Sequence, residues 1–201
     1  MVDSARELER TPQSGAPRSV RRTDPDGLAQ TLEGCLGRLD SLSAAGTAER
    51  LVEVAALCAL SSGVRGWWVG RVDGDQVRVV GQGDVRPGPE GPAHRVVPLA
   101  TLPLRSLTVD PDLAAALEGG SFAGPFPDTP WRAAYAALGI RCAAGAGGYD
   151  DDAHQWLVAL VDDGTVDVRP LRLLVTAAVH AALGVPLPRR AAHQPTYGTE
   201  G

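Results

Sequence analysis

The sequence predicts one α+β domain, in which a central antiparallel β-sheet is flanked by N- and C-terminal helices. Three observations favour this fold: helical periodicity near both ends of the chain, a hairpin signal around residues 66–82, and a second pair of strand-like runs around residues 140–161. Hairpins between terminal helices are typical of an antiparallel sheet with helices packed on it. The length of 201 residues fits one domain, and a hydrophobic content of 44% is enough to build its core.

A leucine-rich pattern predicts the first helix. Its apolar residues are spaced by four and three positions, so they share one helix face; they are Leu28, Leu32, Cys35, Leu39 and Leu42. Two heptads are too few for an independent coiled coil. The stripe therefore packs either on its own domain or in a shared dimer interface.

The second helix leads into the strongest local signal in the sequence. Thr47 is the expected N-cap, and the apolar stripe of this helix consists of Leu51, Val54, Ala55 and Cys58. The runs GWWVGRV and QVRVVGQ then flank Asp73-Gly74-Asp75, which predicts a tight hairpin because glycine accepts a positive φ. Alternation along the first strand places Trp67 and Trp68 on opposite faces of the sheet.

The remaining elements follow from proline, glycine and apolar runs. We expect a strand within residues 94–104, a helix that begins at Asp110-Pro111, a short extended piece SFAGPF, and a helix WRAAYAALG. The runs IRCAAGAG and HQWLVALV predict two more strands. The last helix is expected from about Val168 to Leu183, with Asp167 as its cap, Gly184 as its end, and a core-facing side made of Leu171, Leu174, Val175, Ala178 and Ala182.

The two ends of the chain are polar and contain few apolar residues. We expect a flexible arm over residues 1–25, the folded domain over residues 26–184 and a flexible tail over residues 185–201, because the ends bury too little surface to offset their ordering entropy. The first residues lack the apolar region of a signal peptide, and no run is long enough for a membrane helix. We expect a cytoplasmic protein, and its arginine-only basic residues are typical of a GC-rich bacterial genome.

Charge and cysteine usage exclude several classes of function. The formal net charge is −5, whereas nucleic-acid binders normally carry a clustered basic face, so we expect no DNA or RNA partner for the core. Three widely spaced cysteines without a CxxC pair indicate reduced thiols and no disulfide framework. Cys35 and Cys58 lie in apolar helical patterns, where a thiol normally acts as a small buried hydrophobe.

No catalytic, metal or nucleotide motif is complete. The four histidines stand far apart, and none lies in a zinc-binding spacing. The run Asp150-Asp151-Asp152 lacks the spacing, the central glycine and the closing glutamate of a calcium loop, so it reads as a solvated turn. The absence of lysine excludes a P-loop, and no GxSxG elbow occurs. We therefore expect no cofactor, no metal and no catalytic residues.

The order of elements resembles that of a GAF domain over roughly residues 26–184. A long helix precedes the hairpin GWWVGRVDGDQVRVVGQGD, the helix LAAALEGG is followed by a short extended piece, and Leu138-Gly139-Ile140-Arg141 enters a strand much as the family's "LGIRS" segment does. The chain departs from the family after Arg141, where CAAGAGGYD replaces the usual apolar strand, and residues 99–107 align poorly. Neither a cyclic-nucleotide signature nor a convincingly placed bilin-binding cysteine is present.

The resemblance implies a sensor that binds a small molecule or docks a protein partner, and dimerisation through residues 28–42 and the C-terminal helix. It places the expected ligand site at Trp131, Tyr135, Arg141, Phe122 and Cys142. The two aromatic residues of the 131–139 helix could stack on a planar ligand while Arg141 or Arg105 meets an anion; simple core packing is the alternative for each of them.

Three functions are left open by the sequence. The first is a ligand- or protein-binding regulatory module, and the second is a dimerisation scaffold without a ligand. The third is a sulfoxide reductase that uses Cys142, because one enzyme class with this fold, the free-methionine sulfoxide reductases, uses cysteines; such chemistry needs a low-pKa thiolate and a resolving partner.

Overall fold

The computed structural model describes residues 20–22, 24–85, 100–126, 129–130 and 132–185. All of the expected tail except Val185, that is residues 186–201, and most of the expected arm, residues 1–19 and 23, lie outside the described residues. The described end of the arm is paired: Arg21 forms an isolated parallel bridge with Val166. Its amide donates to the carbonyl of Thr165, and its own carbonyl accepts from Asp167.

A six-stranded sheet forms the centre of the domain, and every neighbouring pair of strands is antiparallel. The strand order is β3-β2-β1-β6-β5-β4. The strands are β1 (Gly66–Asp73), β2 (Gln76–Asp84), β3 (Thr101–Pro103), β4 (Ser121–Pro125), β5 (Cys142–Tyr149) and β6 (Gln155–Asp162). This sheet confirms the predicted α+β class.

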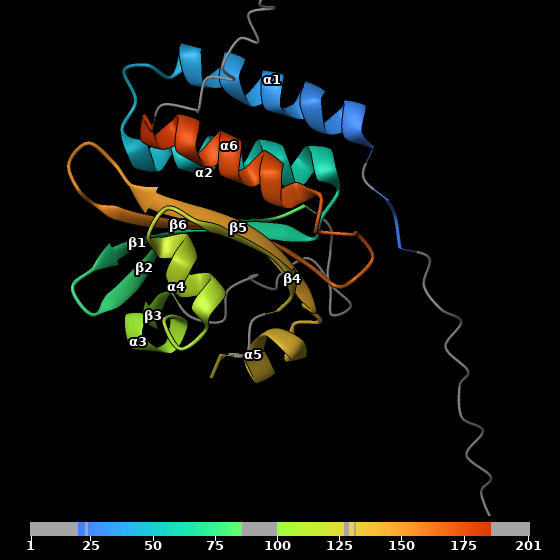
Figure 1. The fold of residues 1–201 in the computed structure, drawn as a ribbon, viewed down its shortest axis with the longest axis vertical. Helices are drawn as coiled ribbons and strands as arrows, with labels where there is room; N and C mark the ends of the chain where they lie inside the picture. The colour runs from blue at the N-terminus through green and yellow to red at the C-terminus, as the bar shows by residue number, and fades with distance from the viewer. Residues whose placement is uncertain (1–19, 23, 86–99, 127–128, 131, 186–201) are drawn as a thin grey trace, which may run out of the picture.

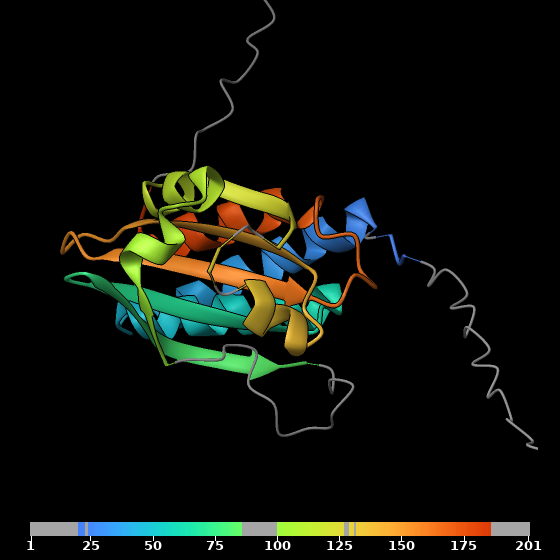
Figure 2. The same cartoon turned by 90° about the horizontal axis from the view of Figure 1, so that it is seen from below.

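Helices cover both faces of the sheet. The helices α2 (Thr47–Ser62) and α6 (Leu171–Leu183) pack on one face, and α1 (Pro25–Ser41) lies over them as a further layer (Figure 1). The opposite face carries three short helices, α3 (Leu104–Leu107), α4 (Pro111–Leu117) and α5 (Arg132–Ala137), as Figure 2 shows from below. Within the described ranges, no helix is both long enough and apolar enough to cross a membrane.

Two hydrophobic clusters fill the two faces. The helical cluster contains Trp67, Leu51, Leu160 and the buried side of α6, with the leucines of α1 packed against it. The opposite cluster contains Trp68, Phe122, Tyr135, Leu113 and Leu157. The alternation of Trp67 and Trp68 between the two faces is therefore confirmed.

Glycine marks the turns and helix ends that the sequence predicts. Gly74 has a φ of 62° between β1 and β2, as the tight hairpin requires. Gly63, Gly139 and Gly184 have positive φ values and follow α2, α5 and α6. Asp110 caps α4 as expected, since its carboxylate accepts from the amides of Asp112 and Leu113.

Three element boundaries differ from the prediction. Gly46 caps α2, and Thr47 is already inside the helix. The strand expected within residues 94–104 includes only Thr101–Pro103, after which the chain turns into α3; residues 94–99 lie outside the described part.

The last helix begins at Leu171, and Asp167 does not cap it. The Asp167 amide is bonded to the carbonyl of Arg21, which keeps the chain extended up to this point. The Asp167 carboxylate accepts from the guanidinium and the amide of Arg169. The helix can start only after these contacts end.

Candidate ligand-binding site

An enclosed cavity lies between the sheet and the three short helices. Its floor is formed by Trp68 of β1, Ala143 of β5 and Ala159 of β6. Its walls come from α3, α4, β4, the segment after β4, and α5; they are Leu107, Leu113, Phe122, Phe126, Thr129 and Tyr135. Because the alanine side chains are short, they leave space above the sheet, and the aromatic rings of the walls can approach it.

Two features of the sequence bring the aromatic walls into place. Gly145 of β5 lies beneath Phe122, and a Cβ at this position would lie 2.5 Å from the Phe122 ring. Phe126 then packs on Tyr135 with ring centroids 4.1 Å apart and an interplanar angle of 31°. Gly145 in the glycine-rich sequence of β5 therefore makes room for the Phe122 ring.

Two polar atoms of the mostly apolar cavity lining have no hydrogen-bond partner in the described part of the chain. Neither the indole Nε1 of Trp68 nor the hydroxyl of Thr129 has a hydrogen-bond partner among the described residues, although both atoms are buried. The phenol of Tyr135 is buried too, and its removal from water raises its pKa, so it stays neutral. The site therefore offers neutral hydrogen-bonding groups in an apolar enclosure.

The free space in the cavity is small. About 10 Å³ is open to the centre of a water-sized sphere, which corresponds to roughly one water molecule. Sites for drug-sized ligands usually measure about 300–1,000 Å³. A larger ligand therefore requires one of the short helices to move away from the sheet.

The structure brings together only part of the residue set predicted for the site. Phe122 and Tyr135 line the cavity, whereas Trp131 lies outside the described residues. Arg141 is exposed, and its side chain lies near Gly164 at the end of β6. Cys142 packs against the helical cluster, on the face opposite the cavity.

The two arginines considered for an anionic ligand lie apart from the cavity walls. Arg105 borders a separate surface hollow with Asp75, Gln76 and Thr108. Sequence reasoning assigned Trp68 to one sheet face but did not select it as a site residue, and it missed Thr129. The alternation of Trp67 and Trp68 along β1 was the available signal for Trp68. No local pattern marks Thr129.

Cys142 has the environment of an unreactive thiol. Burial is the main reason that its pKa is raised to about 11, and the negative charge of Asp162 adds to this effect. The sulfur lies 3.7 Å from the carbonyl oxygen of Asp162. A thiol with this pKa is almost entirely protonated at neutral pH, which makes it a weak nucleophile.

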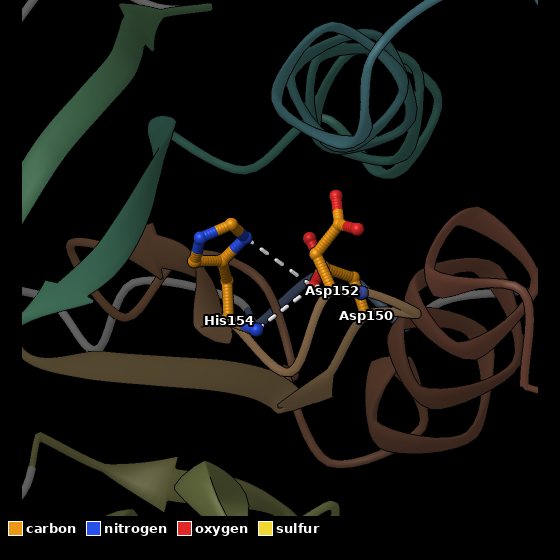
Figure 3. A group of neighbouring side chains, drawn as sticks. All are labelled: Asp150, Asp152 and His154. Atoms are coloured by element: carbon orange, nitrogen blue, oxygen red, sulfur yellow. Dashed lines mark hydrogen bonds and ion pairs between the residues drawn. The ribbon is translucent and has the colours of Figure 1, made fainter.

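Asp150, Asp152 and His154 form a second cluster at the turn between β5 and β6 (Figure 3). One ligand atom from each lies within 4.8 Å of the others. The Asp150 carboxylate, however, already accepts hydrogen bonds from the amides of Asp152 and His154 and from the Trp156 indole. These donors tie the carboxylate to the hairpin turn, which it stabilises.

A larger but open hollow lies on the outer surface, between α1 and α2. This groove, which we call the α1–α2 groove, has a volume of about 670 Å³. Its α1 side contains Gly34, Cys35 and Arg38, and its α2 side contains Glu53 and Leu57. Arg38 and Glu53 form an ion pair of 2.8 Å across it. Because this groove is open to solvent, it is a poorer small-molecule site than the enclosed cavity.

Comparisons with known proteins identify the fold. No family model matches the sequence, and no curated protein matches it either. Among solved structures, the phycoerythrobilin-bound GAF domain of a cyanobacterial phytochrome is similar, with 14% identity and a TM-score of 0.52 over 76% of this chain and 95% of that one.

Two further similar structures have different activities. One is the free methionine-R-sulfoxide reductase of Neisseria meningitidis in complex with its substrate, with 15% identity and a TM-score of 0.52 over 84% of this chain and 96% of that one. The other is CepR2 of Burkholderia cenocepacia, an N-acylhomoserine lactone dependent transcription factor of the LuxR family, with 26% identity and a TM-score of 0.51 over 81% and 96%.

The six-stranded antiparallel sheet, the helices on its two faces and the similar solved structures agree with the order of elements read from the sequence. The chain therefore has a GAF-like fold.

Proposed function

We propose that this domain is a regulatory module that binds a small, neutral molecule in the cavity beneath the sheet. The observation that carries the proposal is a pair of buried groups, Trp68 Nε1 and Thr129 Oγ1, for which the described part of the chain supplies no hydrogen-bond partner. A buried polar group without a partner costs about 1–3 kcal/mol, so a ligand that accepts hydrogen bonds from both groups would recover this energy.

The chemistry of the lining selects the class of ligand. No charged side chain contributes to the described cavity walls, and the aromatic rings of Phe122, Phe126 and Tyr135 favour a flat or apolar molecule. A carbonyl group is the simplest acceptor for the Trp68 indole. N-acylhomoserine lactones combine a neutral carbonyl group with an apolar chain, and the likeness to a factor that depends on such lactones supports their use as a probe.

The first test is native mass spectrometry of protein purified gently from its own host. A defined extra mass identifies the class of ligand, and we expect it to be neutral. The second test is isothermal titration with N-hexanoyl homoserine lactone, in wild type and in Trp68→Phe. Loss of the indole donor is expected to weaken binding about tenfold, which corresponds to roughly 1.4 kcal/mol.

Trp67→Phe is the matched control, because Trp67 lies on the opposite face of the same strand. We expect this variant to bind the probe like wild type. Equal weakening in both variants would mean that the effect comes from lost stability and not from the cavity. A clean apo mass together with no heat of binding would contradict the proposal.

A scaffold without a ligand is the second candidate, and the small free volume of about 10 Å³ favours it. Both the ligand-binding module and the scaffold would form a homodimer through residues 28–42 and the C-terminal helix. The leucine stripe of α1 packs against the helical cluster of its own chain, so a dimer would have to use the outward face of this helix. Sedimentation velocity at micromolar concentration tests the dimer, and a monomer would contradict it.

A sulfoxide reductase based on Cys142 receives support only from the likeness to the Neisseria enzyme. The raised pKa of Cys142 and its position away from the cavity oppose it. An assay of wild-type protein with free methionine sulfoxide and a thiol reductant decides this candidate; we expect no turnover.

A further inference from the structure

Two buried thiols meet at the contact between α1 and α2. Cys35 of α1 and Cys58 of α2 have their sulfur atoms 3.7 Å apart, and their exposed fractions are 0% and 1%. The two residues are separated by 23 positions in the sequence, so only the packing of the helices brings them together. Since a disulfide has an S–S distance of about 2.05 Å, a small shift of two short side chains would allow a bond.

We propose that Cys35 and Cys58 form a peroxide-sensitive pair that closes to an intramolecular disulfide and fastens α1 to α2. This site lies on the helical face of the sheet, opposite the cavity, and its chemistry does not depend on a ligand there. The proposal therefore goes beyond the small-molecule function, and either one can fail without the other.

The position of Cys35 gives an oxidant a route to the pair. Cys35 is part of the wall of the α1–α2 groove. Its helix, α1, forms the outermost helix layer (Figure 1). Gly34 and Gly37 of α1 line the same groove, and a Cβ added to either would meet no described atom within 4 Å. Packing therefore does not require glycine at these positions.

Glycine is nevertheless the weakest helix former apart from proline. Two glycines beside Cys35 lower the stability of this part of α1, which favours local opening of the helix over α2. Local opening exposes the Cys35 sulfur to a small oxidant while the rest of the fold stays intact.

The pair is also polarised toward reaction at Cys35. The hydrogen bond from Cys58 lowers the pKa of the Cys35 thiol, which outweighs the opposing effect of burial. Cys35 lines the groove through which an oxidant arrives and Cys58 does not, so Cys35 is the nucleophile. The Cys58 sulfur lies 3.7 Å away, within reach of the first oxidation product, and acts as the resolving thiol.

The reaction balances with hydrogen peroxide as the oxidant. The Cys35 thiolate attacks one peroxide oxygen, the O–O bond breaks, and the products are a sulfenic acid and one water after proton transfer. The Cys58 sulfur then attacks the sulfenic sulfur, the S–O bond breaks, and a second water leaves. Two thiols lose two electrons and two protons, and one peroxide becomes two waters.

The test is a count of thiols in the wild-type chain before and after peroxide treatment. After removal of the peroxide, the protein is unfolded and alkylated with iodoacetamide, and labels are counted by intact mass. The sequence contains three cysteines, so we expect three labels before oxidation and one afterwards, on Cys142. The unlabelled protein is expected to lose about 2 Da and to run as a single chain on a non-reducing, denaturing gel.

Reduction with dithiothreitol is expected to restore all three labels, and peptide mapping is expected to join Cys35 to Cys58. Cys142→Ser is the matched control and should pass from two labels to none. Persistence of all three labels, loss of the label on Cys142 first, or stable addition of oxygen to Cys35 without a link to Cys58 would overturn the proposal.

The local-opening step has its own variant. Gly34→Ala strengthens the helix beside Cys35 without a steric conflict, so we expect disulfide formation to slow several-fold. An unchanged rate in this variant would overturn the opening route.

Discussion

Asp162 is the residue whose replacement we expect to damage this fold most. It is fully buried at the end of β6, where one carboxylate oxygen accepts from the amide of Arg65 at 3.0 Å. The other oxygen accepts from the amides of Gly164, Thr165 and Val166 at 2.8–2.9 Å. This single side chain therefore fixes the start of β1 and the loop after β6.

The residues that Asp162 holds contact both faces of the domain. Val166 forms the parallel bridge to Arg21, which precedes α1. The buried guanidinium of Arg65, whose amide binds Asp162, donates to the carbonyl of Leu138 just after α5. Loss of the carboxylate would leave several amide groups without an acceptor, and a buried unsatisfied group costs about 1–3 kcal/mol.

We expect Asp162→Ala to lower the free energy of unfolding by about 3–5 kcal/mol, since truncation removes the common acceptor of four buried or half-buried amides. Asp162→Asn should cost less, about 1.5–3 kcal/mol, because its remaining oxygen can serve the loop amides while the Arg65 amide loses its acceptor. Stabilities of domains lie at about 5–15 kcal/mol, so the alanine variant is near the limit of folding.

Urea unfolding, followed by circular dichroism and tryptophan fluorescence, measures both variants. Asp163→Asn is the control, because this neighbour is half-buried and accepts from the amide of Thr165 at 3.2 Å. An Asp162→Ala variant within about 1 kcal/mol of wild type would refute the reasoning. A loss of stability in Asp163→Asn as large as that in Asp162→Asn would refute it too.

Two further predictions test the sheet and its turn. Gly147→Ala should destabilise the domain by about 1–3 kcal/mol in the same urea assay, because the new Cβ would collide with the carbonyl oxygens of Trp156 and Ala116; Gly37→Ala, which meets nothing within 4 Å, should be neutral or stabilising. Burial opposes ionisation of Asp150, but hydrogen bonds from Trp156 and His154 outweigh it and lower its pKa. Its contribution to stability is therefore present above the unfolded-state pKa of about 3.9 and is lost as the pH falls through the lower folded-state value. Asp150→Asn should flatten this acid loss in unfolding curves measured between about pH 5 and pH 2, and an unchanged pH dependence would contradict the assignment.

Local chemistry alone determined much of the architecture. Gly74 between two strand-like runs fixed the first hairpin, because a tight turn needs a positive φ. Asp110 with Pro111 fixed the start of α4, and Gly184 fixed the end of α6. The class of the fold followed, since hairpins and amphipathic helices leave few ways to bury their apolar faces.

Element boundaries that depend on distant partners could not be read in this way. Aspartate is a common N-cap residue, so Asp167 was the expected start of α6. Its backbone is instead paired with Arg21 and extended, and α6 starts later, at Leu171. The leucine stripe of α1 could pack in a dimer interface or on its own domain. In the structure it packs within the chain, against the cluster formed by α2 and α6.

The candidate sites depend even more on tertiary structure. Phe122 and Tyr135 could be selected from the sequence because aromatic residues are scarce, but the sheet face of Cys142 and the approach of Thr129 to Trp68 depend on how the strands and short helices pack. The contact between Cys35 and Cys58 joins two helices and has no local signature. The sequence by itself determined which segments form helices, strands and turns, because those depend on neighbours along the chain; only the tertiary structure decided which side chains meet, because that depends on contacts across it.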